Sequence, residues 1–299
     1  MPTLRQLDYL VTLADTGHFG RAAQQANVSQ PTLSQQIRTL EQRLGIDLVE
    51  RRGRGAALTP PGRELAERAR NVLASVDDIR NFAARAAGRL TGTLRFGVTP
   101  TLGPYLLPGV IAALHKDAPD LKLVIQEGIP DDQLDALTRA RLDLLLGALP
   151  LDAPGVVSEP LFRETLLLVV PVDHPLAGGG DTAALAGEPV LSLDPRHPYH
   201  RQVEAICARY DMRLMRDYEG TSLDSLQQMT ASGLGLALLP ELYLRSEAAG
   251  RSGTVTPDIA GWEPAYRSIG LAWRDGAALS DAFHQLGEGI AARARQLLG

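Results

Sequence analysis

The chain has 299 residues, enough for two or three domains, because a single hydrophobic core rarely serves more than roughly 250 residues. Hydrophobic residues make up 44% of it and charged residues 22%, which are ordinary globular values and argue against extended disorder. The net charge of −5 is unevenly divided: residues 1–90 hold thirteen arginines and nine acidic residues, a net charge of +4, and the remainder carries −9. This asymmetry suits a DNA-binding end joined to a domain that does not bind DNA.

The residue pattern excludes both membrane insertion and an intramolecular disulfide. The longest apolar run, 166–172, is far shorter than the roughly 20 residues of a membrane-spanning helix. Asp8 and Asp15 lie in the first apolar region, where a secretory signal carries no charge, so we expect a soluble, cytoplasmic protein. The single cysteine, Cys207, rules out an intramolecular disulfide and a zinc site built from cysteines.

Residues 1–59 are predicted to form three helices followed by a hairpin. A first amphipathic helix ends at Gly17, and a short second helix carries small alanines that permit close helix crossing. Ser29 is a good N-cap for the third helix, and Pro31 falls in its first turn, where a missing N–H does no harm. The apolar face of the third helix consists of Leu33, Ile37, Leu40 and Leu44.

The opposite face of this third helix is polar and has no carboxylate in its N-terminal half. Glutamine, serine, threonine and arginine side chains there suit hydrogen bonding to base edges and phosphates, as in a recognition helix; a merely solvated face is the alternative. Residues 46–50 and 57–59 are then expected to form two short strands around the basic turn 51–55. A hairpin with an arginine-rich tip suits contact with phosphates or the minor groove.

The run Ala22-Ala23, then 28–34, then 48–51 resembles the LysR-type transcriptional regulators in a long, ungapped match. In that family the third helix lies in the major groove and the wing flanks it. The resemblance implies promoter double-stranded DNA as a partner and a winged helix-turn-helix domain over 1–59. The implied groove contacts are Gln30, Pro31, Thr32, Ser34, Gln35 and Arg38, and the implied wing contacts are Arg51, Arg52 and Arg54.

Residues 60–89 are predicted to form a long linker helix that begins after Thr59 and ends at Gly88. Its apolar positions are spaced alternately by four and three residues, a heptad seam that favours a homodimer through this helix. A helix packed along its own domain is the alternative. The family resemblance adds a homotetramer and contact with RNA polymerase as expected assemblies. The seam consists of Leu65, Ala69, Val72, Val76, Ile79, Ala83 and Ala86.

Residues 90–299 alternate β-rich runs with helical segments, which predicts an α/β fold with ligands at the carboxyl ends of strands. The region resembles the LysR effector domain, two lobes related to periplasmic binding proteins with a small-molecule effector between them. Lobe I is expected at about 90–162 and 268–299, and lobe II at about 163–267. Strands are expected at 94–98, 121–126, 142–146, 166–170, 190–193 and 268–273, and helices at 102–116, 132–140, 199–210, 222–232 and 279–298.

Polar residues and glycines gather at the predicted strand ends. The run 99–101 ends the first of these strands and opens a helix, so that its hydroxyls and free backbone N–H groups suit an anion or a polar ligand. For any single residue, ordinary helix capping is the alternative. The predicted effector contacts are Thr99, Pro100, Thr101, Gly128, Gly147, Ser192, His197, Thr221 and Arg274.

Within the family, the segment 98–108 resembles the hydrogen-peroxide-inducible regulators of the OxyR group. Those sensors oxidise a cysteine in a His-Cys pair, and a second cysteine nine residues later closes a disulfide. Here the pair reads His197-Pro198, only the second position is kept as Cys207, and Pro130 replaces a threonine implicated in handling peroxide. We therefore predict reversible binding of a small molecule; a redox response through Cys207 alone is the alternative, weakened because that thiol lies among apolar helix residues.

Two other classes of protein are set aside on the same residues. An enzyme is not expected, because the six histidines are scattered and neither a Gly-x-Ser-x-Gly elbow nor a phosphate-binding glycine loop is present. No catalytic residue, metal ligand or cofactor is therefore predicted. A solute-binding protein would fit the two-lobed domain alone, but the missing export signal and the residues before Thr91 argue against it.

Overall fold

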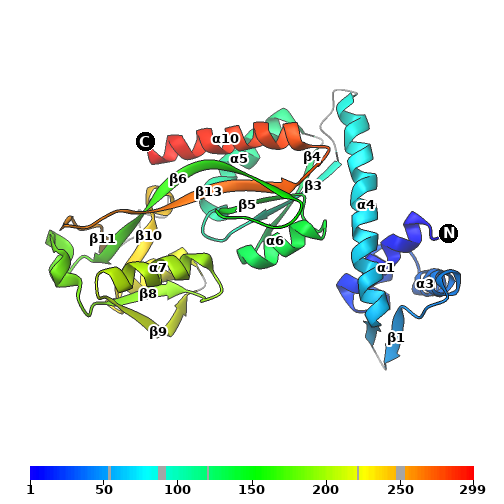
Figure 1. Ribbon diagram of the computed structural model, residues 1–299, viewed down its shortest axis with the longest axis horizontal. Helices are drawn as coiled ribbons and strands as arrows, with labels where there is room; N and C mark the ends of the chain where they lie inside the picture. Colours follow the sequence, from blue (N-terminus) through cyan, green and yellow to red (C-terminus); the bar gives the residue numbers. More distant parts are fainter. Residues whose placement is uncertain (53–54, 87–91, 120, 221, 247–252) are drawn as a thin grey trace. The chain divides into compact units, whose positions relative to one another are not determined.

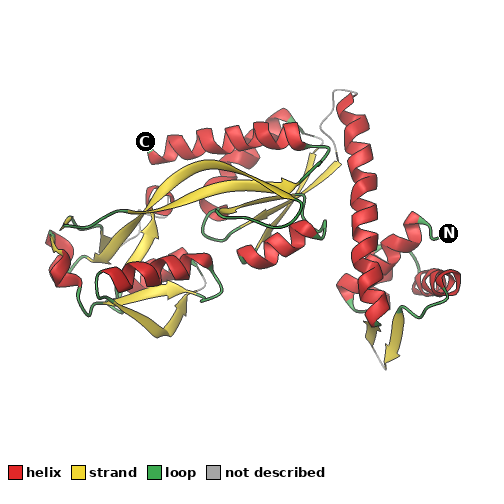
Figure 2. Cartoon of the chain, in the orientation of Figure 1, coloured by secondary structure: helices red, strands yellow, loops and turns green. Residues whose placement is uncertain are grey.

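The computed structural model describes residues 1–52, 55–86, 92–119, 121–220, 222–246 and 253–299 (Figure 1). Contacts divide the chain into two compact units, Met1–Arg89 with Arg139–Arg141, and Leu90–Thr138 with Leu142–Gly299. The first unit is helical apart from one hairpin, whereas the second mixes helices with strands (Figure 2). None of the described helices combines the length and the apolar run that a bilayer crossing needs.

The N-terminal unit contains the three predicted helices and the predicted hairpin. Thr3 and Gln6 form a capping box at the start of the first helix, and Gly17 ends it in the left-handed conformation with φ 61°. Ser29 caps the third helix by accepting a hydrogen bond from the Thr32 N–H at 3.3 Å. The elements are α1 Leu4–Thr16, α2 Phe19–Gln25, α3 Gln30–Leu44, β1 Val49–Arg52, β2 Gly55–Leu58 and α4 Pro60–Ala86.

The hairpin starts three residues later than the sequence pattern predicts. β1 and β2 are antiparallel, with Val49 opposite Leu58. Ahead of them, the Glu41 carboxylate on α3 accepts the backbone N–H groups of Leu48 and Val49 at 2.9 and 3.1 Å. The Glu41 side chain therefore bonds the backbone N–H groups that a longer hairpin would have paired between its strands, and it links the wing to α3.

The start of α4 approaches the hairpin too closely for any side chain at Gly62. Its N–H donates to Thr59 Oγ1 at 3.0 Å, and that hydroxyl donates to the Asp47 carbonyl at 2.7 Å. A Cβ added at Gly62 would stand 2.1 Å from the Leu48 carbonyl oxygen. Glycine is therefore required by a backbone contact, in addition to the predicted capping by Thr59.

The heptad seam of α4 has two environments. Leu65 and Ala69 face the unit's own interior, since Ala69 is buried and Leu65 packs on its hydrophobic core. Val72 and Ile79 are instead exposed, at 44% and 68%. The first part of the seam thus packs along its own domain, and the later part presents apolar side chains to solvent. The side chains of Ala83 and Ala86 lie outside the described residues.

The second unit is built on a mixed seven-stranded sheet of order β10-β6-β13-β5-β3-β4, with β11 paired to β6. β3, β4 and β5 are parallel neighbours, whereas β13 runs antiparallel to both β5 and β6. The strands are β3 Gly92–Val98, β4 Leu121–Glu127, β5 Leu144–Ala148, β6 Val156–Pro171, β10 Ala237–Pro240, β11 Thr254–Val255 and β13 Ala265–Arg274.

Helices and two small parallel sheets complete this unit. β8 Pro189–Leu193 pairs with β9 Arg213–Gly220, and β7 Gly180–Asp181 pairs with β12 Ile259–Ala260. The five predicted helices are confirmed to within two residues, while β9, β10 and α9 were not predicted. The helices are α5 Gly103–Asp117, α6 Pro130–Thr138, α7 Pro198–Arg209, α8 Leu223–Ala231, α9 Glu241–Arg245 and α10 Ser280–Leu298, with 3₁₀ turns Pro175–Gly178 and Thr182–Leu185.

Two large hydrophobic cores give this unit the predicted two-lobed form. Val98 and Leu146 belong to one core, whereas Leu191 and Val203 belong to the other. The long strands β6 and β13, green and orange in Figure 1, contribute to both: β6 places Phe162 against the first core and Leu166 in the second. The lobe boundaries at residues 162 and 267 remain a prediction, whereas the mixed sheet and its helices establish the α/β architecture.

Candidate functional site

The exposed face of α3 forms the first candidate site. Leu33, Ile37 and Leu40 are buried in the N-terminal core, as the helical spacing predicted. The side chains on the opposite face are exposed to solvent. Gln35 and Arg38 are three residues apart, so they lie on the same exposed face of the helix. Of the predicted groove contacts, Gln30, Pro31, Thr32, Gln35 and Arg38 are exposed and Ser34 is half-buried.

The polar side chains of this face differ in how free they are. Thr32 shares a hydrogen bond of 2.8 Å with the Ser29 hydroxyl, so its hydroxyl is partly committed to the helix start. For Arg38, the structure records neither a hydrogen bond nor an ion pair among the described residues. A guanidinium with five unengaged N–H donors is suited to a phosphate or to the O6 and N7 atoms of guanine.

The predicted wing contacts fall at the edge of the described chain. Arg51 and Arg52 lie on β1, opposite Ala56 and Gly55 of β2. Arg54 lies outside the described residues, as do the side chains of Arg51 and Arg52. Their contact with DNA therefore stays a prediction.

The second candidate site starts at the carboxyl ends of β3, β4 and β5. The Thr99 N–H donates to the Leu146 carbonyl at 3.2 Å, and the Gly128 N–H donates to the Val98 carbonyl at 3.2 Å. A Cβ added at Gly147 would touch the Thr99 methyl group at 3.4 Å. The sheet thus gathers five of the predicted effector contacts, Thr99, Pro100, Thr101, Gly128 and Gly147.

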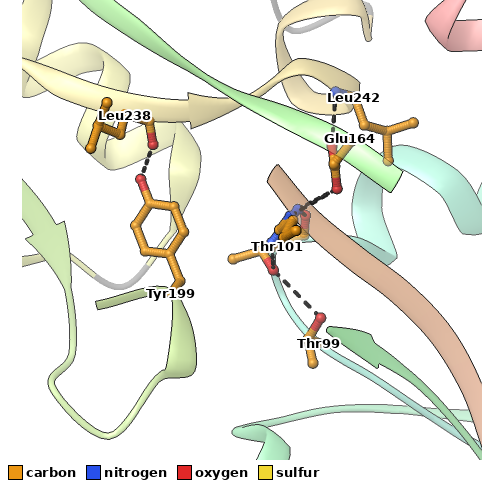
Figure 3. A network of polar contacts seen from close by, with 7 residues as sticks. Thr99, Thr101, Glu164, Tyr199, Leu238 and Leu242 are labelled. Carbon is orange, nitrogen blue, oxygen red and sulfur yellow. Dashed lines mark hydrogen bonds and ion pairs between the residues drawn. The ribbon is translucent and has the colours of Figure 1, made fainter. Parts of the chain in front are cut away.

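A buried ion pair that the sequence analysis missed adjoins these residues (Figure 3). Arg267 on β13 donates from Nε to Glu164 Oε1 at 2.8 Å, and Glu164 Oε2 accepts the Leu242 N–H at 3.0 Å. The same guanidinium donates to the Thr101 hydroxyl at 2.9 Å and to the Thr101 carbonyl at 3.0 Å. Both charged side chains are almost fully buried, so this pair ties the two crossing strands to the lobe I cluster.

Ser192 and His197 come from the end of β8 and the start of α7. Ser192 Oγ is buried and has no hydrogen-bond partner among the described residues. His197 caps α7, because its Nδ1 accepts the Tyr199 N–H at 3.2 Å, and its Nε2 is likewise buried without a partner. Tyr199 itself is anchored by a hydrogen bond from its hydroxyl to the Leu238 carbonyl (Figure 3).

The His197 ring is neutral at ordinary pH. Burial, followed by the nearby positive charge of Arg267, lowers the pKa of His197 to about 4. Arg267, whose guanidinium donates to the Thr101 hydroxyl, is thus one of the charges that act on His197.

Two predicted effector contacts fall elsewhere. Arg274 lies at the carboxyl end of β13, opposite Val156 of β6, at the edge of the sheet away from Thr99, and it donates to the Leu137 and Leu142 carbonyls at 3.1 and 2.5 Å. Its Nη2 atom lies 3.6 Å from Asp143 Oδ1, so Arg274 holds α6 against the sheet and lies apart from Thr99 and Thr101. Thr221 lies outside the described residues.

Cys207 lies on α7 with its side chain in the lobe II core, 3% exposed. Burial is the main cause that raises the pKa of its thiol to about 11. The thiolate is the reactive form of cysteine, so this thiol is poorly nucleophilic in the folded state. Within the described residues, no group of three or more histidine, cysteine or carboxylate side chains is placed to hold a metal ion.

A winged helix-turn-helix joined to a separate two-lobed unit with a buried polar cluster defines a DNA-binding regulator with an effector-binding domain. Residues 4–63 match the family described as bacterial regulatory helix-turn-helix protein, lysR family. Residues 87–295 match the LysR substrate binding domain. The chain therefore belongs to the LysR family, as the resemblance of its third helix predicted.

Relatives of the OxyR group match this chain over nearly its whole length. It is 39% identical over 292 residues to the DNA-binding transcriptional dual regulator OxyR of Escherichia coli K12, covering 97% of this chain and 95% of that protein. It is 38% identical over 299 residues to a probable hydrogen peroxide-inducible genes activator of Streptomyces viridosporus, covering 99% and 96%. The resemblance to the hydrogen-peroxide-inducible group is thereby confirmed.

Solved structures of OxyR proteins are similar to this chain over nearly its whole length. A full-length OxyR mutant of Pseudomonas aeruginosa has a TM-score of 0.78 at 33% identity, covering 96% of this chain and 94% of that one. A hydrogen peroxide-bound OxyR mutant of Corynebacterium glutamicum has a TM-score of 0.67 at 33% identity, covering 100% and 94%. The fold of this chain is thus that of the OxyR-group regulators.

Proposed function

We propose that this LysR-family regulator reads promoter DNA with the exposed face of α3, flanked by the β1–β2 wing. The observation that carries this is the division of α3 into a buried apolar face and an exposed face where Arg38 has no partner within the described residues. Glutamine and threonine beside it supply neutral donors and acceptors for base edges. A DNase footprint on the intergenic region upstream of its own gene tests this proposal: a protected site is expected, and none at any protein concentration would refute it.

We further propose that the effector binds at the polar cluster that joins the two lobes. Thr99, Thr101 and Ser192 are buried hydroxyl residues, and His197 adds a buried ring nitrogen without a partner in the described chain. Buried polar atoms are normally hydrogen-bonded, and a bound ligand is one way to satisfy them. Arg274 is not part of this proposal because its donors are engaged on the other side of the sheet.

Effector binding would act on DNA by changing the relative orientation of the lobes. Tyr105 on α5 donates a hydrogen bond of 2.7 Å to Asp224 on α8, and Arg267 links Thr101 to Glu164. A ligand that favours one arrangement of these contacts would shift its population, with a coupling of roughly 1–3 kcal/mol. The same footprint with and without effector measures this; an unchanged footprint at saturating ligand would contradict it.

A homodimer through α4 is proposed on the exposed part of its seam. Val72 and Ile79 present apolar side chains to solvent at heptad spacing, the arrangement that a partner helix covers. Pairing would place two copies of α3 on two half-sites, so that their phosphate contacts add. A homotetramer on longer sites and contact with RNA polymerase are further parts of this proposal and rest on the family resemblance.

Catalysis is not proposed. The relatives named above are regulators, and His197 is placed as a helix cap, with Nδ1 accepting the Tyr199 N–H, and does not activate a nucleophile. Cys207 is buried in the lobe II core.

An oxidant response through Cys207 is the second candidate function. It is favoured by the relatives, which include hydrogen peroxide-inducible activators. It is opposed by the burial and the raised pKa of this thiol, which would require α7 to open before oxidation. Promoter binding before and after peroxide, in the wild type and in Cys207→Ser, separates the two. A peroxide effect that vanishes in the variant would establish the redox function, and an equal response in both proteins would exclude it.

A further inference from the structure

Gln6 is a polar residue on the buried face of α1. It lies three and four residues before Tyr9 and Leu10, which belong to the N-terminal core, and it is only 2% exposed. A buried amide is costly unless it is hydrogen-bonded, whereas methionine would fill a similar space without that requirement. What the amide adds at this position is therefore its set of hydrogen bonds.

Those hydrogen bonds fix which way the Gln6 amide points. Its Oε1 accepts the Thr3 backbone N–H at 3.2 Å and Arg43 Nη1 at 3.1 Å. A backbone N–H and a guanidinium can only donate, so the oxygen has to lie on this side of the amide. The Nε2 group lies on the other side and donates to Gln36 Oε1 at 3.1 Å. The Gln36 amide is thereby oriented as well, with its oxygen towards α1.

The two partners of Gln6 on α3 hold one flank of that helix. Gln36 and Arg43 are seven residues apart, so they project on nearly the same side of α3, two turns or roughly 10 Å apart along its axis. Arg43 Nη1 also donates to the Met1 carbonyl at 3.1 Å. One side chain thus bonds α1 to α3 at two levels, and these bonds oppose rotation of α3 about its own axis.

The rotation of α3 decides where its groove-facing side chains point. Gln35 adjoins Gln36 in the sequence, and Arg38 is two residues further on. A side-chain tip stands about 5–6 Å from the helix axis, so a rotation of about 15° moves it by roughly 1.5 Å. A hydrogen bond to a base edge is lost over such a distance, whereas the attraction between a guanidinium and a phosphate falls off more slowly.

We propose that Gln6 is a positioning residue for base reading: its bonds to Gln36 and Arg43 set the rotation of α3, and with it the approach of the groove-facing side chains to the bases. Because Gln6 is buried, it acts only through α3. Its loss should reduce sequence discrimination without a comparable loss of general DNA affinity. This role of Gln6 deepens the proposed DNA-reading function and rests on it.

The variant Gln6→Met tests this role, because methionine fills the space of glutamine and makes none of its hydrogen bonds. The full-length protein is titrated at one salt concentration with two duplexes, the segment protected in the DNase footprint and the same base pairs in scrambled order. The ratio of the two dissociation constants measures sequence discrimination. Thr12→Val is the matched control, since Thr12 is also buried on α1 and the structure records no hydrogen bond from its side chain to α3 among the described residues.

Gln6→Met should lower this ratio at least about tenfold, the equivalent of one lost bidentate base contact, and leave binding of the scrambled duplex within about twofold of the wild type. Thr12→Val should keep the wild-type ratio. Gln36→Met breaks the same link from α3. The double variant of Gln6→Met and Gln36→Met should therefore lose less discrimination than the two single losses combined.

Wild-type discrimination by Gln6→Met would overturn this role, and so would single losses that combine in full in the double variant. Gln36 is half-buried, so Gln36→Met supplies the same readout if Gln6→Met does not fold, and wild-type discrimination by that variant would be equally decisive. Failure of the proposed DNA-reading function would look different, since the wild type itself would then bind both duplexes alike.

Discussion

Removing Arg267 should destabilise the two-lobed unit more than removing any exposed arginine. In Arg267→Met, the Glu164 carboxylate keeps one hydrogen bond, from the Leu242 N–H at 3.0 Å, and loses two contacts of 2.8 Å. Thr101 loses the donors to its hydroxyl and its carbonyl at the same time. Because Glu164 is almost fully buried, the unpaired charge should cost about 3–5 kcal/mol.

Tryptophan fluorescence measures this loss in the relevant unit, because both tryptophans, Trp262 and Trp273, belong to it. For a unit of this size each kcal/mol corresponds to roughly 2–4 °C, so the melting temperature should fall by about 6–20 °C. Arg209→Met is the control, since its pair with Glu263 is exposed and should be worth less than about 1 kcal/mol.

A second substitution separates the buried charge from the lost packing. Adding Glu164→Gln to Arg267→Met removes the unpaired carboxylate and should restore much of the lost stability. The reasoning is refuted if Arg267→Met melts together with the Arg209→Met control. It is equally refuted if the double variant is less stable than Arg267→Met alone.

Three further predictions concern other parts of the chain. The pKa of His197 is lowered from 6.5 to about 4, so between these pH values the unfolded chain binds more protons than the folded protein. The free energy of unfolding, measured in urea, should therefore fall by about 2 kcal/mol from about pH 7 to about pH 5. The variant His197→Asn should not show this fall. Gly62→Ala forces a Cβ against the Leu48 carbonyl and should cost the N-terminal unit about 1–3 kcal/mol. Ile79→Glu should convert the proposed dimer into monomers in analytical ultracentrifugation.

Two of these substitutions have matched control variants. Gly289→Ala adds the same methyl group on α10, where no atom lies within 4 Å, and should be neutral or stabilising. Ser75→Glu adds a charge to an exposed residue of α4 outside the seam and should leave the dimer intact. The His197 argument is contradicted if His197→Asn shows the same pH dependence as the wild type. The Gly62 argument fails if Gly62→Ala unfolds at an unchanged midpoint, and the dimer proposal fails if Ile79→Glu remains dimeric.

The helices could be predicted because their apolar spacing is regular and their ends carry strong signals. Ser29 and Gly17 are examples, one as an N-cap and the other as a left-handed C-cap. β6 was predicted only at 166–170, although it begins at Val156, because polar residues such as Glu159 and Arg163 conceal the first half of the strand. This first half forms a strand because it pairs with β13, which is distant in sequence, and the local residue pattern does not reveal such a partner.

The polar residues at the carboxyl ends of β3, β4 and β5, where we propose that the effector binds, were predicted in part. Thr99, Gly128 and Gly147 could be found because parallel strands end at one edge, where the rule for ligand positions applies. Arg274 was misplaced because β13 runs antiparallel, so its carboxyl end lies at the opposite edge of the sheet. Arg267 was predicted only as the end of lobe II; an arginine near the start of a largely buried strand was the signal for its ion pair.

Binding of a promoter duplex to the full-length protein, followed by fluorescence anisotropy at several salt concentrations, tests the central claim most directly. The wild type should bind with an affinity that falls steeply as salt rises, and Arg38→Ala should lose about 1–3 kcal/mol of binding free energy. Arg68→Ala, an exposed arginine of α4 paired with Glu64 at 2.7 Å, should bind like the wild type. Salt-insensitive binding, or equal affinity of Arg38→Ala and wild type, would contradict a DNA-reading face on α3.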